Sequence, residues 1–319
     1  MLSQETKAPE QIEELTIFAP AKINLHLVVK NRREDGFHNL ESLFLALNFG
    51  DLLHFKAMDT ISDEIIMGNN DIPMLDNIIY KAMSLFREKT SFSRRFKVIV
   101  EKHIPIGGGL GGGSSNAAAS LLALNKIASN LTGIAPLNLQ ALLEMAAALG
   151  SDVPFFIHET PAAWVSGRGE LIEPIDILPP MFLVLINPGF PSDTARAFRI
   201  LDEKKESGII NHEWNLRFLH KPHEPVLRGI SSTLFMGNNI FNLPLYNDFL
   251  YVFPEKERET YNEIISALQS EGAQYANLSG SGATCFGVFY EEEQAKKAAA
   301  HLHEKWEFIQ LCRSQCSPN

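Results

Sequence analysis

The first half of the chain alternates between short apolar runs and longer stretches with apolar residues at helical spacing. Residues 15–30 predict a strand, because apolar and polar positions alternate in the segment INLHLVV. Residues 76–90 predict a helix, with Ile78, Met83 and Phe86 recurring on one side. The other predicted elements of this half are two strand runs within 35–55, broken at 48–50, a strand over 94–105, and helices over 114–129 and 137–150.

The second half continues the mixture of strands and helices after a Pro-rich boundary. Residues 162–175 predict a hairpin that turns at Gly167–Gly169, and the segment DILPP at 176–180 is a candidate domain boundary. Residues 203–229 are polar and irregular, which is typical of a surface insertion. The remaining predictions are a strand over 181–188, a helix over 259–272, a strand–turn–strand over 275–290 and a closing helix over 291–306. We therefore expect an α+β protein with two domains, 1–176 and 177–319.

Composition excludes several classes of protein. The chain has 319 residues, is 45% hydrophobic and carries a net charge of −10, which suits a packed enzyme-sized protein and argues against nucleic acid as a partner. No apolar run reaches the roughly 20 residues that span a bilayer. With a polar, acidic start and only three cysteines, the sequence predicts no membrane association and a cytoplasmic location. Cys312 and Cys316 with His301 and His303 are either a metal site or, as we favour, an incidental surface cluster.

Six glycines surround a single Leu110 in the segment GGGLGGG at 107–113. Glycine loses more entropy on folding than other residues, so this cluster needs a reason. A strand, a glycine loop and a helix form an anion site, because main-chain N–H groups and the helix N-terminus face the ligand. The absent side chains would let phosphate oxygens approach, Leu110 would anchor the loop inward, and Ser114 and Ser115 would add hydroxyls. The alternative is a purely structural turn.

Other phosphate-binding motifs fit this loop poorly. A Walker P-loop needs a lysine at its end, but no Lys occurs between Lys102 and Lys126. The spacing of Gly107, Gly109 and Gly112 matches a dinucleotide fingerprint, yet no Asp or Glu follows from Gly113 through Leu143 to bind the ribose. Protein-kinase motifs are also missing.

The segment PIGGGLGGGSSNAA resembles the central motif of the GHMP kinases, a superfamily of small-molecule kinases. PAKINL at 20–25 is similar to the N-terminal motif of that family, and NLSGSGATCFGVF at 277–289 to its C-terminal glycine motif. The resemblance implies an N-terminal ribosomal-S5-like nucleotide domain, a C-terminal ferredoxin-like α/β sandwich, ATP with Mg²⁺, and phosphorylation of an alcohol. Together with DGFHNLESLF, LDNIIYKA and LGSDVPFFI, these motifs resemble the branch whose substrate is a cytidine diphosphate-linked sugar alcohol.

The resemblance implies a catalytic pair. Asp152, after a helix end, matches the catalytic base of the family, and its alternative role is to cap the turn before Pro154. Lys22 stands in an apolar strand, where a cation is costly without a partner, so we expect it to pair with Asp152 and a phosphate. The alternative is a surface lysine on an edge strand.

The remaining expected site residues bind nucleotide or substrate. His38 would meet a cytosine edge, and Phe37 would stack on it where the family usually carries Tyr, with Phe198 as a second aromatic face. A homoserine- or mevalonate-type GHMP kinase and a non-catalytic nucleotide-binding relative stay open as alternatives. The expected substrate-binding set is Asn24, Phe37, His38, Thr194, Phe198, Gly280 and Gly282. The expected nucleotide-binding set is Pro105, Ile106, Gly107, Gly108, Gly109, Leu110, Gly111, Gly112, Gly113, Ser114, Ser115, Asn77 and Lys102, with Ser115 the one candidate metal ligand.

Overall fold

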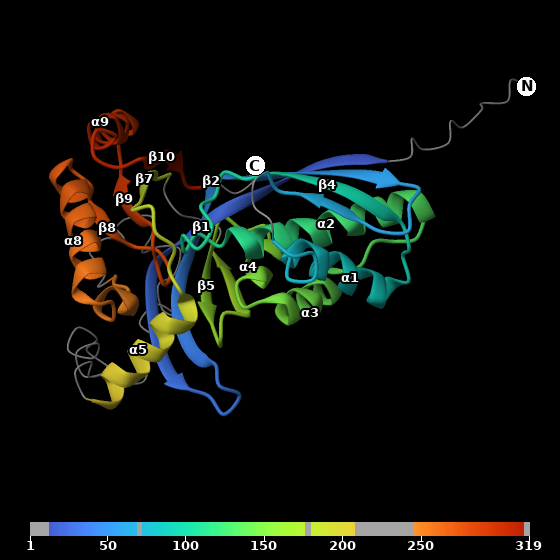
Figure 1. Cartoon of the computed structure of the whole chain (residues 1–319), viewed down its shortest axis with the longest axis horizontal. Coiled ribbons are helices and arrows are strands. Elements are labelled where there is room, and N and C mark those ends of the chain that lie inside the picture. Colours follow the sequence, from blue (N-terminus) through green and yellow to red (C-terminus); the bar gives the residue numbers. More distant parts are fainter. Residues whose placement is uncertain (1–12, 69–71, 176–179, 208–244, 316–319) are drawn as a thin grey trace, which may run out of the picture.

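Two β-sheets, each covered by helices, build the structure, a computed structural model that describes residues 13–68, 72–175, 180–207 and 245–315 (Figure 1). The N-terminal half contains β1 (Glu14–Arg32), β2 (His38–Met58), β3 (Glu64–Ile66), α1 (Ile78–Thr90), β4 (Arg95–Glu101), α2 (Gly112–Thr132), α3 (Leu139–Leu149), α4 (Val153–Ile157), β5 (Ala162–Ser166) and β6 (Leu171–Ile175). The C-terminal half contains β7 (Phe182–Asn187), α5 (Thr194–Glu206), the 3₁₀ turn η2 (Asp248–Tyr251), α8 (Glu255–Ser270), β8 (Tyr275–Leu278), β9 (Cys285–Phe289), α9 (Glu292–Leu302) and β10 (Phe308–Arg313).

The long hairpin of β1 and β2 is the backbone of the first sheet. β2 pairs with β1 along one edge, and its other edge is shared by β4 at one end and β5 at the other. Helices α1 to α4 lie on one face of this sheet (Figure 1). The apolar side chains of that face, such as Phe44 and Phe55, form one core with helix residues such as Ala118 and Leu121.

The predicted break at residues 48–50 is wrong, since β2 runs unbroken from His38 to Met58. Gly50 pairs with Pro20, and the register of β1 shifts between Pro20 and Lys22. A Cβ on Gly50 would collide with the carbonyl oxygen of Ala19. The glycine therefore lets two strands approach closely at a bulge, where they bend without ending.

The alternation in β1 separates two cores, because both faces of the strand are covered. Ile23 and Leu25 face away from the helices and pack with Leu183 and Leu185 of β7 in a core that joins the two sheets. This shared core fixes the C-terminal half against the hairpin. β6 ends at Ile175 and β7 begins at Phe182, in the other sheet, which supports the proposed domain division at 176/177.

The C-terminal half has the ferredoxin-like arrangement that the resemblance implies. Its sheet has the strand order β10-β7-β9-β8, with antiparallel neighbours, and helices α8 and α9 pack on its outer face. β10 follows the predicted closing helix but was not itself predicted. Of the predicted surface insertion, 203–206 instead belong to α5, and 208–229 lie outside the described residues.

The observed starts of helices α1 and α2 match the sequence predictions only in part. Asn77 caps α1 by accepting a hydrogen bond from the N–H of Ile79, as its residue type favours. α2 begins at Gly112, inside the glycine loop, and not at the predicted Ser114. Its N-cap is Gly111, with φ of 71° and no capping side chain, so the first N–H groups of the helix remain available to a ligand.

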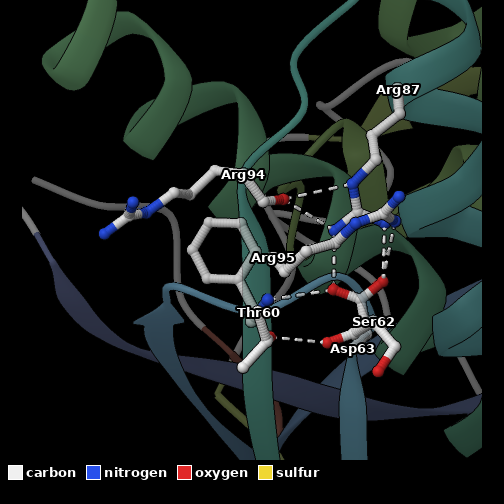
Figure 2. A network of polar contacts seen from close by, with 7 residues as sticks. Thr60, Ser62, Asp63, Arg87, Arg94 and Arg95 are labelled. Carbon is white, nitrogen blue, oxygen red and sulfur yellow. Dashed lines mark hydrogen bonds and ion pairs between the residues drawn. The ribbon is translucent and has the colours of Figure 1, made fainter.

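A buried carboxylate fastens the edge of the first sheet near the end of α1 (Figure 2). Asp63, just before β3, accepts two hydrogen bonds from the guanidinium of Arg87, at 2.7 and 2.8 Å, and one from the N–H of Phe96. Arg95 lies 3.5 Å from the same carboxylate. This network ties the short strand β3 to helix α1 and strand β4.

Candidate active site

The glycine loop lies between β4 and α2 and is anchored from both sides. Leu110 is buried, and its carbonyl accepts a hydrogen bond of 2.9 Å from the N–H of Lys22 in β1. Gly107, Gly109 and Gly111 all have positive φ, between 68° and 74°. Alternating left-handed residues turn successive N–H groups toward one side, which is the geometry of an anion-binding concavity.

Protein atoms, and not only a ligand, explain the absence of side chains in the loop. A Cβ on Gly109 would collide with the Ser279 carbonyl, and one on Gly111 would lie 2.9 Å from the side chain of Lys22. The expectation that all six glycines make room for phosphate is therefore too simple. Among them, Gly113 has the most open surroundings, with its nearest neighbour atom 3.9 Å away on Ile78.

Lys22 and Asp152 meet beside this loop. The Lys22 ammonium lies 3.4 Å from a carboxylate oxygen of Asp152, with the lysine side chain 4% and the aspartate side chain 30% exposed. Asp152 occupies the N-cap position of α4, yet its side chain makes no capping hydrogen bond. The two alternatives, a capping aspartate and a surface lysine, therefore do not describe this structure.

Two residues that the sequence analysis did not connect hold Lys22 in place. The Lys22 ammonium donates a 2.7 Å hydrogen bond to Oδ1 of Asn24. The Asn24 amide nitrogen donates to the Ser42 hydroxyl at 2.9 Å, and Ser42 in turn donates to the His26 carbonyl. Ser42 fixes the orientation of the Asn24 amide so that its oxygen faces the ammonium. The signal available in the sequence was the position of the Ser42 hydroxyl directly before the apolar run LFLAL.

Lys102 and Asn77 have structural partners at the cavity wall. The Lys102 ammonium lies 2.5 Å from the buried carboxylate of Asp51, whose other oxygen accepts the N–H groups of His103 and Ile104. Asp51, missed in the sequence, thus fixes the entry to the glycine loop. Asn77 is occupied by its cap and by a contact of its amide with the Met67 sulfur at 3.1 Å.

One cavity of about 520 Å³ connects most of the expected site residues. Its wall contains Lys22, Asn24, Asn77, Lys102, Asp152, Thr194, Phe198, Gly280 and all of 105–114. Ser115, Phe37, His38 and Gly282 are not part of that wall. Gly282 instead packs its carbonyl against Gly109, and the Thr194 hydroxyl lies 2.8 Å from that of Ser281. The structure therefore brings the glycine loop, the Lys22–Asp152 ion pair and α5 together around one cavity.

Of the two residues expected to bind the cytosine ring, His38 packs against α5, whereas Phe37 lies beside Arg168. His38 is buried, its Nε2 lies 2.7 Å from a carboxylate oxygen of Asp202, and its ring stacks on Phe198 at 5.0 Å. Phe37 is 48% exposed, with the Arg168 guanidinium 5.0 Å from its ring centre.

The comparisons with known proteins agree on one family. Residues 77–160 match the GHMP kinases N terminal domain, and residues 254–307 match the GHMP kinases C terminal domain. A 4-diphosphocytidyl-2-C-methyl-D-erythritol kinase of Thermodesulfovibrio yellowstonii is 35% identical, with 92% of this chain and 95% of the relative covered. The chain belongs to this family of GHMP kinases. A kinase of the same name from Paramagnetospirillum magneticum is 34% identical over 91% of this chain and 95% of its own.

Solved structures of GHMP kinases share the fold. A crystal structure of 4-(cytidine 5'-diphospho)-2C-methyl-D-erythritol kinase superposes with a TM-score of 0.73 at 29% identity, covering 94% of this chain and 100% of that chain. Homoserine kinase from Cytophaga hutchinsonii gives a TM-score of 0.57 at 16% identity, covering 99% of this chain and 97% of its own, which shows the fold alone. The predicted α+β architecture of GHMP kinases is thereby confirmed.

A GHMP kinase uses ATP, and buried atoms near the helix start fit a phosphate with its cation. The Ser115 hydroxyl and the Asn116 side-chain oxygen are buried without a hydrogen-bond partner. Within the described ranges, no three His, Cys, Asp or Glu side chains gather as a metal site. At the tail, Cys312 is buried and not on the surface as expected, and Cys316 lies outside the described residues. No described helix is both long and apolar enough to cross a membrane.

Proposed function

We propose that this chain transfers the γ-phosphoryl group of ATP to the 2-hydroxyl of 4-diphosphocytidyl-2-C-methyl-D-erythritol, a step of isoprenoid precursor biosynthesis. The observation that carries the proposal is the Lys22–Asp152 ion pair, which opens into the cavity that the glycine loop lines. The membership of the chain in this kinase family supports the substrate. Given the ATP requirement, we place the reaction in the cytoplasm.

Asp152 accepts the proton of the attacking hydroxyl in this proposal. Its carboxylate is partly exposed and lines the cavity. Although Asp152 is the N-cap residue of α4, its side chain makes no capping hydrogen bond. The substrate oxygen bonds to the γ-phosphorus as the bond to the β-phosphate oxygen breaks, and ADP leaves with that electron pair. Proton transfer to a placed base contributes about 10²–10⁴-fold to rate.

Lys22 pairs with Asp152 and stabilises charge on the transferring group. Its ammonium is buried, so its interactions are poorly screened by water. Asn24 takes one of its three N–H donors, and Asp152 lies within ion-pair distance. The remaining donor is suited to a phosphate oxygen. The Lys22 backbone also holds the glycine loop through Leu110, which couples the position of the ammonium to that of the nucleotide.

The loop and the start of α2 would hold the triphosphate of ATP. The first N–H groups of this 21-residue helix have no capping side chain, and the helix dipole adds partial positive charge there. Mg²⁺ would neutralise phosphate oxygens. The expected ligand Ser115 lies outside the cavity wall, whereas Asn116, whose side-chain oxygen has no hydrogen-bond partner, is part of it. Because no carboxylate cluster lies among the described residues, we propose that phosphates supply most of its ligands.

Substrate turnover tests the proposal directly. Purified protein with ATP and Mg²⁺ is given 4-diphosphocytidyl-2-C-methyl-D-erythritol, homoserine or mevalonate in parallel, and ADP release and ³¹P NMR of the product are followed. We expect ADP release and a new phosphate monoester only with the cytidylyl substrate. Turnover of homoserine or mevalonate instead would assign the chain to another GHMP activity.

A further inference from the structure

We propose that a second cavity, formed mainly by residues of 86–95 and 125–137, binds a small organic anion: a phosphate or carboxylate that carries an apolar group. This second cavity measures about 920 Å³, a volume typical of small-molecule sites, and shares no residue with the cavity that Lys22 and Asp152 line. It lies at the C-terminal end of α2, whose 21 residues separate it by about 30 Å from the glycine loop. The inference is therefore independent of the proposed function.

The basic residues of the second cavity all come from the segment after α1. Lys89 has a side chain that is 59% exposed, and those of Arg94 and Arg95 are each 34% exposed. The acidic residues of the wall are Asp59, which is already paired with Arg94 at 2.5 Å, and the exposed Glu13. In a chain with a net charge of −10, this excess of cations favours an anionic ligand.

Arg94 offers a hydrogen-bond donor that lacks an acceptor. Its Nη1 donates to Asp59, but its Nε is buried and has no hydrogen-bond partner within the part of the chain that the structure describes. A buried donor without a partner costs stability. The edge of a guanidinium formed by Nε and Nη2 matches two oxygens of a carboxylate or phosphate. A small turn of this guanidinium toward such a ligand would satisfy the unpaired donor.

The main chain at Arg94 is fixed in place before any ligand binds. The Arg94 carbonyl accepts hydrogen bonds of 2.9 and 3.2 Å from the guanidinium of Arg87, which is itself held by the buried carboxylate of Asp63. Figure 2 shows the Arg94 side chain extending away from this network. The guanidinium can therefore adjust to a ligand while the backbone that carries it stays where it is.

The apolar part of the wall suits the other half of the ligand. Ile134 is 70% exposed, and Leu131 and Leu137 are half-buried with one side on the core of the first sheet. Because α2 ends here, the partial negative charge of its C-terminus disfavours an anionic group beside these residues. We therefore expect the charged group of the ligand at 89–95 and its apolar group at 131–137.

Methyl NMR of the full-length protein during titration with hexyl phosphate tests the inference. We expect saturable shifts of the Ile134 and Leu137 methyl signals. The affinity should be at least tenfold higher than for inorganic phosphate or for hexanol, since each of these carries only half of the recognised chemistry. Hexanoate is titrated in parallel, and the tighter binder of the two amphiphilic anions identifies the charged group. Absence of saturable shifts, or an affinity no higher than that of hexanol or of inorganic phosphate, would overturn the inference.

Arg94→Gln removes the guanidinium that the inference places on the anion. We expect the affinity for hexyl phosphate, followed at the Leu137 methyl signals, to fall at least tenfold while that for hexanol stays unchanged. Arg196→Gln is the matched control, because Arg196 also pairs with one acid, Glu257 at 3.4 Å, and lies outside both cavities. An unchanged affinity in a folded Arg94→Gln variant, or an equal loss in both variants, would contradict the inference. If Arg94→Gln does not fold, the wild-type comparison of the two anions with hexanol decides.

Discussion

The ammonium of Lys22 lies 3.4 Å from the carboxylate of Asp152, and of these two side chains the aspartate is the more exposed. A buried cation thus holds a carboxylate that a substrate can still reach. The lysine is itself oriented from behind by Asn24 and Ser42, so the pair is prearranged before any ligand binds.

Asp152→Asn removes the proposed base and leaves the shape of the site nearly unchanged. We expect kcat to fall by about 10²–10⁴-fold. ATP affinity should change little, because the loop that we propose to hold the phosphates keeps its contacts. Steady-state kinetics and calorimetric titration with a non-hydrolysable ATP analogue check both parts. Asp59→Asn, at an exposed carboxylate outside the cavity, is the control, and equal loss in both variants would contradict the role of Asp152.

Ser42→Ala tests the hydrogen bonds that orient Lys22, the proposed catalytic lysine. The change leaves the Asn24 amide nitrogen without its acceptor and frees the amide to rotate away from Lys22. We expect kcat to fall between about ten- and a hundredfold, since small misplacements at a reacting centre have effects of this size. KM for ATP should stay near its wild-type value. Ser62→Ala removes the same atom at an exposed position and should leave both constants unchanged.

Gly109→Ala tests the close approach of the two glycine loops. The new methyl group would collide with the Ser279 carbonyl at a backbone φ of +74°, where L-residues are strained. We expect a loss of about 2–4 kcal/mol in the free energy of unfolding, from strain and overpacking together. Gly113→Ala is the matched control, because its methyl group would make only an ordinary contact, 3.9 Å from Ile78, and chemical denaturation of the apo protein compares the two. A similar loss in both variants would argue against the close approach as the cause.

Asp63→Asn tests the buried carboxylate of Figure 2. The Asp63 side chain is fully buried against Arg87, so its neutralisation leaves a guanidinium without its counter-charge. We expect a loss of about 3–5 kcal/mol in stability, typical of breaking a buried pair. Asp59→Asn, whose side chain is 87% exposed beside Arg94, should cost less than about 1 kcal/mol. Thermal and urea denaturation measure both, and equal losses would contradict the network.

His26 makes the stability of the fold depend on pH. Burial lowers the pKa of His26 from 6.5 to about 4. The unfolded chain therefore binds a proton between these values that the folded chain does not, and stability falls as pH decreases from 6.5 toward 4. The difference corresponds to roughly 3 kcal/mol. In His26→Phe this part of the pH dependence should disappear, whereas His303→Phe, at an exposed histidine, should keep it.

The sequence predicted the elements whose pattern is local. The capping residue and the apolar face of α1 lie within fifteen residues of sequence, so the helix was found. The glycine loop was found because so many glycines in one segment are entropically costly and mark a special backbone conformation. β10 was missed because the first four of its six residues, Phe308–Leu311, are only half-buried and its sequence shows no alternation of apolar and polar positions. A break in β2 was wrongly predicted because Gly50 is required by its close contact with Ala19 of the neighbouring strand β1, which the linear sequence does not reveal.

The same limit applies to the site. The resemblance to GHMP kinases linked Lys22, Asp152 and the glycine loop, and all three lie in the wall of one cavity. Asp202 lies 164 residues from His38, and no local pattern links them. Ser42 and Asp51 act on residues outside their own segments in the same way. Residues that orient other residues are found only when the chain is folded.

The contact of Ser279 with Gly109 has a further consequence. The Ser279 hydroxyl donates to the Gly109 carbonyl, and Ser192 donates its N–H to the carbonyl of Gly107, so turns of the C-terminal half hold the glycine loop of the N-terminal half. In a chimera that joins this N-terminal half to the C-terminal half of a distant relative, the main-chain contacts at the glycine loop would no longer fit. Recombination between such enzymes is therefore constrained at the level of main-chain fit, even where every catalytic side chain is retained.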